Sequence, residues 1–465
     1  MDIIYILIPL VFLMIMAYRG ASVIVFAPIA AMLGVLLYNP AWIPGFFTGI
    51  FMEKLAGFVK LYLPVFLLGA IFGKMVELVG YARSIAEFII HRLGQEKAIL
   101  SIVLVGAVLT YGGVSLFVVV FALYPFASNL FKRAGIPKRL IPGTIALGAF
   151  TFTMDSFPGT PQIQNIIPTS FFNTDAWAAP VLGITGGLVT FLIGMYYLNH
   201  RARKARLKGE GYGHNHHNEP EEMTDGEMVP PVYLAVLPLV MVAVVNKLYG
   251  MWLPGFYGSH FDFSDAGVQD TPSVLISHIA AIWSVSAGLI AGIVVIILFS
   301  FRRIKAKIFT GLNVSVGGAL LATINTASEY GFGGVIAALP GFRLLSDKMG
   351  EIFRDPLVNE AVTTTTLAGI TGSASGGLSI TLAAMGEQYV NMAMEAGIPM
   401  EVMHRIASMA SGGMDTLPHN GAVITLLAVT GLTHRESYRD IFFLTIMKVV
   451  IVFFVIGLYY TTGWV

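Results

Sequence analysis

Two short segments of the chain each place an acid, a hydroxyl and a proline inside an apolar run. They read MDSFPG at 154–159 and MDTLPH at 414–419. An acid at membrane depth costs roughly 2.5–3.5 kcal/mol on insertion scales, which favours a functional reason for Asp155 and Asp415. We expect both carboxylates to bind and release protons, together with Glu329, a third acid in an apolar run. The alternative for the two aspartates is a cap on an unwound segment, with no part in proton transfer.

The other candidate residues are hydroxyls, amides and glycines beside these segments or in two glycine-containing turns. They are Tyr111, Gly112, Gly113, Ser115, Thr160, Gln162, Asn165, Ser373, Ser375, Gly376, Ser379, Thr416, His419 and Asn420. Because no Lys or Arg is expected close to these positions, a bound carboxylate would be held by helix N-termini and neutral donors. This set favours a small, singly charged anion over a tricarboxylate. As alternatives, the glycine pairs could be close-packing positions, and Ser373 and Ser375 could bond backbone carbonyls.

The composition indicates that these residues lie in a membrane protein. Of 465 residues, 56% are hydrophobic and 12% are charged, against about 25% charged in soluble domains. Apolar runs approaching the roughly 20 residues that cross a bilayer recur along the chain. We therefore predict an all-α integral membrane fold. The net charge of +1 gives no reason to expect a nucleic-acid partner, and the absence of Cys excludes disulfides and thiolate metal sites.

The sequence lacks the short motifs of several catalytic classes. It contains no HExxH zinc motif, no GxSxG nucleophile elbow and no GxxxxGK[ST] nucleotide loop. These absences argue against an enzyme and against an ATP-driven pump, and we expect no cofactor.

The two halves of the chain repeat the same landmarks in the same order. The segment GGVS at 112–115 returns as GGLS at 376–379, and AGIP at 134–137 recurs identically at 396–399. We therefore predict one repeat over 1–200, a cytoplasmic linker over 201–229 and a second repeat over 230–465. Arg19 after the first span and the basic residues in the linker and near 302–307 and 435–439 indicate that the repeats have inverted topology.

Each repeat is expected to contain about five spans and one re-entrant hairpin. The hairpins are predicted at about 98–131 and 357–394, and the broken spans at about 138–172 and 400–432. Pro158 and Pro418 each remove a backbone donor, which predicts unwound segments that meet at the midplane of the membrane. Amphipathic surface helices are predicted at 81–93 and 342–354.

The linker combines basic and acidic residues with a histidine cluster. Five basic residues come first, and acidic residues follow, which predicts a flexible cytoplasmic segment. His214, His216 and His217 are candidate metal ligands, but a solvated linker is the favoured interpretation. We expect no metal site.

Three stretches resemble the gluconate permease (GntP) family of the ion transporter superfamily. They are GSASGGLS at 372–379, the repeated AGIP, and FPGTPQIQN at 157–165, and the likeness covers essentially the whole chain. The resemblance implies a multi-pass protein of the bacterial inner membrane that takes up hydroxy-carboxylates with protons. It also implies scaffold and transport domains, a homodimer and an elevator movement.

The chain departs from the gluconate members in two places. Those members carry an HxxPPHPG type segment where this chain has residues 154–162, and an SHVND type segment near 418–421. The variant found here resembles the branch associated with short hydroxy acids such as 3-hydroxybutyrate. A cation/proton antiporter on the same inverted-repeat scaffold is the alternative, and Na⁺ in place of H⁺ is left open as the coupling ion.

Overall fold

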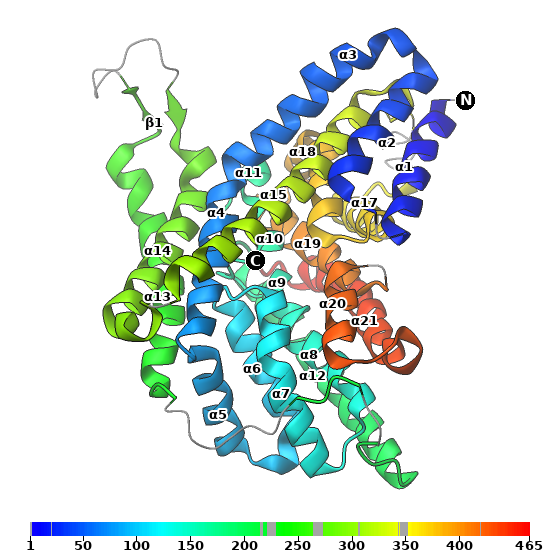
Figure 1. Ribbon diagram of the computed structural model, residues 1–465. Coiled ribbons are helices and arrows are strands. Elements are labelled where there is room, and N and C mark those ends of the chain that lie inside the picture. Colours follow the sequence, from blue (N-terminus) through cyan, green and yellow to red (C-terminus); the bar gives the residue numbers. More distant parts are fainter. Residues whose placement is uncertain are drawn as a thin grey trace.

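The arrangement of the chain comes from a computed structural model (Figure 1). The structure describes residues 2–19, 21–213, 217–220, 229–263, 273–305, 307–342, 344, 352–418 and 420–465. Nearly all the described secondary structure is helical, in agreement with the predicted all-α class.

The first half begins with three long helical stretches and ends with one long helix. Its elements are α1 (Asp2–Tyr18), α2 (Val23–Tyr38), η1 (Pro40–Trp42), α3 (Ile43–Phe46), η2 (Phe47–Met52), α4 (Glu53–Leu78), α5 (Tyr81–Leu93), η3 (Gln95–Lys97), α6 (Ala98–Tyr111), α7 (Leu116–Ala134), η4 (Lys138–Leu140), α8 (Ile141–Ala149), α9 (Phe152–Asp155), α10 (Ile163–Ile166), α11 (Thr169–Phe172) and α12 (Pro180–Leu207). Helix α5 has the bounds predicted for the first surface helix.

The second half follows the same order among its described elements. They are α13 (Val232–Tyr257), β1 (His260–Phe261), β2 (Val274–Leu275), α14 (Ile276–Ile304), α15 (Ile308–Ala338), α17 (Pro356–Thr371), α18 (Ala374–Ala396), α19 (Met400–Gly412), η6 (Gly413–Thr416), α20 (Gly421–Thr430) and α21 (His434–Thr462). The two short strands pair antiparallel. Most of the surface helix predicted at 342–354 lies outside the described residues.

Six of the described helices are long and apolar enough to cross a membrane. A helix rises about 1.5 Å per residue, so about 20 residues span the hydrocarbon core. The longest stretch, Pro40–Leu78, has 39 residues. Their outer faces carry large apolar side chains, such as Leu192 at 62% exposure, because lipid replaces water as their surroundings.

Both predicted hairpins are pairs of helices joined by tight turns. Residues 112–115 join α6 to α7, and residues 372–373 join α17 to α18. Gly113 (φ +94°) and Gly372 (φ +69°) adopt the left-handed backbone that these turns require.

The second glycine pair lies in a different place from the one predicted. Gly376 and Gly377 belong to the first turns of α18, whereas the hairpin turns at Gly372. Their lack of a side chain admits close neighbours instead: a Cβ at Gly376 would overlap the Glu329 carboxylate, and one at Gly377 would overlap the backbone of Ala368. Close approach, and not positive φ, is therefore the role of this pair.

The two predicted broken spans are interrupted as expected. After α8 the first one contains only the short helices α9, α10 and α11, and the second passes from α19 through η6 to α20. In Figure 1 the labelled α9, α10 and α19 lie near the middle of the molecule, with β1 near the top and α5 near the bottom. Helix α10 packs against both α9 and α19, so the breaks of the two halves meet.

The closing helices of the two halves, α12 and α21, are fastened together near both ends. At one end, Arg201 Nε is 2.7 Å from Asp440 Oδ1, and the Tyr197 hydroxyl donates to the same oxygen at 2.9 Å. At the other end, the Val181 N–H donates to the Val465 carbonyl at 3.2 Å. The two spans are therefore joined as one element.

The start of the linker differs from the flexible segment that was predicted. Helix α12 continues to Leu207, so much of the basic cluster is helical. Beyond it, Glu210 pairs with Arg139 at 2.7 Å, and Glu219 pairs with Lys132 at 2.6 Å and Lys138 at 2.8 Å. These ion pairs dock the described part of the linker on α7 and η4.

The predicted histidine cluster is only partly described. His217 contributes its backbone carbonyl, which accepts a hydrogen bond from Lys138 Nζ at 2.7 Å. His214 and His216 lie outside the described residues. In the part of the chain that the structure describes, no group of His, Asp and Glu could hold a metal ion.

Acid is expected to weaken the docking of the linker. Burial raises the pKa of Glu219, but the ammonium groups of Lys132 and Lys138 outweigh it and lower the pKa from 4.5 to about 2. The stabilisation is therefore complete above pH 4.5 and is lost as the pH falls toward 2. Glu219→Gln should lower the melting temperature at pH 7. The difference in melting temperature between this variant and the wild type should become smaller in thermal scans below pH 4.5. A difference that is constant with pH would contradict this assignment.

Candidate functional site

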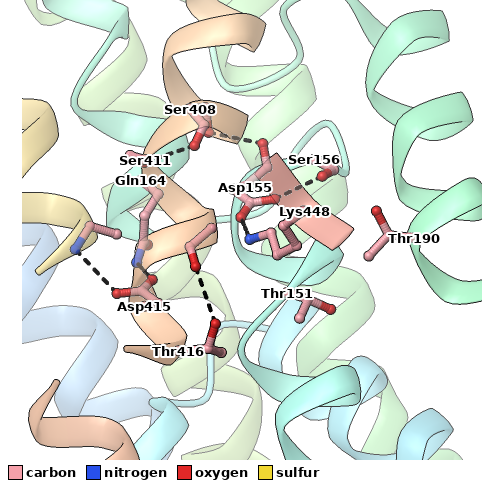
Figure 2. Close-up of polar contacts among 12 residues, drawn as sticks. Thr151, Asp155, Ser156, Gln164, Thr190, Ser408, Ser411, Asp415, Thr416 and Lys448 are labelled. Atoms are coloured by element: carbon pink, nitrogen blue, oxygen red, sulfur yellow. Dashed lines mark hydrogen bonds and ion pairs between the residues drawn. The ribbon is translucent and has the colours of Figure 1, made fainter. Parts of the chain in front are cut away.

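Asp155, at the end of α9, forms an ion pair with Lys448 of α21 (Figure 2). The side-chain exposures of the two residues are 0% and 3%, so the pair lies inside the protein. The Ser156 hydroxyl donates to Asp155 Oδ1 at 2.7 Å. A buried charge is costly unless it is paired and hydrogen-bonded, and Asp155 satisfies both conditions.

Helix α19 of the second half also donates hydrogen bonds to the break around Asp155. The backbone carbonyl of Asp155 accepts from Arg405 Nη1 at 3.0 Å and from the Ser408 hydroxyl at 2.9 Å. Arg405 donates further to the Ala178 carbonyl at 2.7 Å and to Asn165 Oδ1 at 2.9 Å. The guanidinium therefore supplies the donors that this unwound backbone needs in the absence of water.

Gly412 leaves the room that the ion pair occupies. A Cβ at this position would overlap Asp155 Oδ2 and lie close to Lys448 Nζ. We expect Gly412→Ala to displace the pair and to lower the free energy of unfolding by about 1–3 kcal/mol, the usual cost of overpacking. Thermal unfolding of the purified protein measures this loss. Gly421→Ala is the matched control, because a Cβ there meets nothing within 4 Å; an equal loss in both variants would refute the steric argument.

Asp415, the corresponding acid of the second half, is bound only by neutral donors among the described residues. Its Oδ2 accepts a hydrogen bond at 2.8 Å from the amide of Gln164, which belongs to the first break (Figure 2). Its Oδ1 accepts from the Ala374 N–H at 3.3 Å and from the Asn420 amide at 3.4 Å. The Ala374 N–H belongs to the first residue of α18, so the carboxylate lies at the positive end of that helix.

The tip of the second hairpin carries several hydroxyls on the residues that flank Ala374. Ser373 caps α18 by accepting from the Gly376 N–H at 3.0 Å, and its hydroxyl is 3.4 Å from that of Ser375. The Ser375 hydroxyl also lies 3.5 Å from that of Thr326. Glu329, one turn further along α15, is buried with its carboxylate against Gly376.

The candidate residues of the first hairpin are bonded mainly to the first break. The Tyr111 hydroxyl donates to the Pro158 carbonyl at 2.8 Å, and the Gln162 amide donates to the Thr110 carbonyl at 2.8 Å. Gly112 packs closely on Leu239 of α13, and Gly113 forms the turn beside Pro161. Ser115 precedes α7 as its N-cap residue.

The remaining candidates have structural partners or lie apart from Asp415. The Asn165 amide donates to the Thr160 and Ala176 carbonyls, and the Thr416 hydroxyl is 2.7 Å from that of Thr445. In the described part of the chain, the buried hydroxyls of Thr160 and Ser379 have no hydrogen-bond partner. His419 lies outside the described residues. The structure therefore gathers Asp415, Asn420 and the α18 tip, with Gln164 crossing from the first half.

The expectation of a site without nearby Lys or Arg is wrong. Lys448 and Arg405 both reach the first break, although Lys448 lies 293 residues from Asp155 in the sequence. A signal for Lys448 was present, because a single lysine interrupts the apolar run of the last span, and such residues are rare and functional. Gln164 was also missed; it was visible only as an amide beside the candidates Gln162 and Asn165.

Membrane-length helices, a buried ion pair and two broken spans are together the architecture of a multi-pass membrane transporter. Residues 2–286 match the GntP family permease. The chain thus belongs to the GntP family of permeases. It is similar to the uncharacterized transporter YxjC of Bacillus subtilis (strain 168), with 60% identity over 470 residues that cover 100% of both chains.

Two solved transporters share the fold at low sequence identity. The YdaH transporter of Alcanivorax borkumensis superimposes with a TM-score of 0.55 and 16% identity, covering 89% of this chain and 88% of the other. MtrF of Neisseria gonorrhoeae, described within a class of antimetabolite efflux pumps, gives a TM-score of 0.53 and 15% identity, covering 86% and 82%. At these identities the likeness concerns the fold alone.

Proposed function

We propose that this permease is a proton-coupled symporter that takes up a small hydroxy-carboxylate, such as 3-hydroxybutyrate or gluconate, across the bacterial inner membrane. The observation that carries the proposal is the position of the Asp415 carboxylate at the N-terminus of α18. There it accepts from the Ala374 N–H and from the amides of Gln164 and Asn420. These are the donors that would bind the carboxylate of a substrate.

In the proposed mechanism, protonation of Asp415 makes these donors available. A neutral carboxyl group no longer competes as an anion for the helix N-terminus, so a substrate carboxylate can accept from the Ala374 N–H and the Gln164 amide. The hydroxyls of Ser373 and Ser375 are close enough to the same helix end to bind the substrate hydroxyl. One proton and one monovalent anion then cross together without net charge.

The roles of the three acids differ in this proposal. Asp155 is paired with Lys448 and acts as a fixed part of the break, whereas Asp415, which has neutral donors, takes up the proton. Glu329 faces the hairpin tip at Gly376 and serves as a second protonation site that senses whether the tip is in place. We further propose that the two breaks and hairpins move together as a transport domain, in elevator fashion, within a homodimer.

Uptake into proteoliposomes tests the proposal. Radiolabelled 3-hydroxybutyrate and gluconate should accumulate when the lumen is alkaline, with no requirement for Na⁺. Accumulation that depends on a Na⁺ gradient would contradict proton coupling, and no accumulation of either acid would contradict the substrate class. Proton flux driven by a cation gradient without an organic anion would instead support a cation/proton antiporter.

A further inference from the structure

The last turns of α12 form one side of a pocket that the transport mechanism does not use. Its volume is about 280 Å³. Arg203, Arg206 and Asn199 of α12 line it, together with Ile99 of α6, Ile136 after α7, and Glu96. The pocket therefore combines two guanidinium groups with a buried apolar floor and one acid.

The two arginines differ from their basic neighbours in how they are paired. Arg201 pairs with Asp440 at 2.7 Å and Arg139 with Glu210 at 2.7 Å. In the part of the chain described, no acid pairs with Arg203 or Arg206, and both are exposed. Arg203 and Arg206 are three residues apart in a helix, so their side chains lie on the same face. Among the described residues, the pocket thus presents two guanidinium groups without an ion pair and one acid, Glu96.

The position of the pocket relates it to the membrane surface. The charge pattern of the sequence assigns the end of α12 to the cytoplasmic side. On the same helix, about two and three turns before Arg203, Tyr196 and Leu192 are 74% and 62% exposed. An apolar side chain followed by an exposed tyrosine and then arginines is the order that a helix shows as it passes from acyl chains to headgroups.

We propose that this pocket binds the phosphodiester of an anionic phospholipid with a hydroxyl-bearing headgroup, as in phosphatidylglycerol. Arg203 and Arg206 donate to the phosphate oxygens, for which the planar guanidinium is well suited. Glu96 accepts from a headgroup hydroxyl and disfavours a second negative charge in the pocket. Ile99 and Ile136 contact the glycerol backbone. The site is separate from Asp415 and stands independently of the proposed substrate.

Lipid binding to the purified full-length chain tests the proposal. Phosphatidylglycerol added to the protein in detergent should be retained in native mass spectra and should raise the melting temperature. Phosphatidylcholine and inorganic phosphate are the comparison arms. The double variant R203A/R206A should bind phosphatidylglycerol at least about tenfold more weakly, because two charge-assisted contacts are lost. K204A/K208A removes the same charge from exposed lysines outside the pocket lining and should bind like the wild type.

Each other outcome would overturn a stated part of the proposal. Equal losses in both double variants would show general charge attraction and no pocket. An equal stabilisation by inorganic phosphate and by phosphatidylglycerol would make free phosphate, and not lipid, the ligand. R203K/R206K keeps the charge and should retain only part of the affinity; full affinity would contradict recognition by the guanidinium fork. Because both arginines are exposed, the melting temperatures without lipid should be alike in all variants.

Discussion

Asp415→Asn is expected to abolish the accumulation of substrate that a pH gradient drives. Coupling to one proton supports about a tenfold concentration ratio for each pH unit, since tenfold corresponds to about 1.4 kcal/mol. Asparagine imitates the neutral carboxyl group, so the donors of Gln164 and Ala374 stay available to the substrate. The variant should therefore still exchange labelled for unlabelled substrate across the membrane while reaching a ratio near one.

Counterflow measures substrate exchange, and pH-driven uptake measures accumulation. Both are measured in the same proteoliposomes, so that exchange and proton coupling can be separated. Glu401→Gln is the matched control, because this acid lies in the same broken span but is exposed at its start. It should accumulate substrate like the wild type. Loss of exchange together with uptake in Asp415→Asn would mean that the carboxylate is needed for binding itself. Retained accumulation would remove Asp415 from proton coupling.

Lys448→Met is expected to lower the free energy of unfolding by about 3–5 kcal/mol, because it leaves Asp155 buried without its partner. The methionine fills a similar volume, so most of the loss comes from the uncompensated charge. The double variant D155N/K448M should recover much of the stability, since neither charge is then buried alone. Thermal unfolding in detergent of the single and double variants measures the coupling between the two side chains.

The double variant also separates the roles of the two aspartates. If Asp155 is a fixed part of the break, D155N/K448M should keep pH-driven uptake, whereas Asp415→Asn should not. Lys204→Met, an exposed lysine of α12, is the control and should change stability by no more than about 0.5 kcal/mol. If D155N/K448M were as unstable as Lys448→Met, the loss of stability could not be attributed to the unpaired charge of Asp155.

Periodic and local signals in the sequence predicted much of the fold. Helix α5 has its predicted bounds, and both helix pairs lie close to the ranges predicted for the hairpins. Proline within an apolar run predicted both interruptions for a local reason, the missing N–H. The turn of the second hairpin was misplaced because a glycine pair has two uses, and in α18 it provides close approach and not positive φ.

The site could be predicted only as far as each residue type indicates its own chemistry. Asp155 and Asp415 were conspicuous because carboxylates are expensive in a membrane. Their partners come from distant helices, and the choice of partner depends on packing that no local pattern encodes. Repetition in the sequence also suggested similar surroundings for the two acids. The structure instead gives one of them an ammonium group, and gives the other, among the residues that are described, only amides and a backbone N–H.

The fastening of α12 to α21 has a consequence for how movement can be observed. Arg201 and Tyr197 bind Asp440 at one end, and Val181 is hydrogen-bonded to Val465 at the other. The two helices are therefore expected to move across the membrane as one rigid body. Lys448 lies on α21, so a displacement of Lys448 away from Asp155 is expected to move α12 as well. A spin label on the exposed face of α12 would report the displacement of Lys448 without any change to the buried pair.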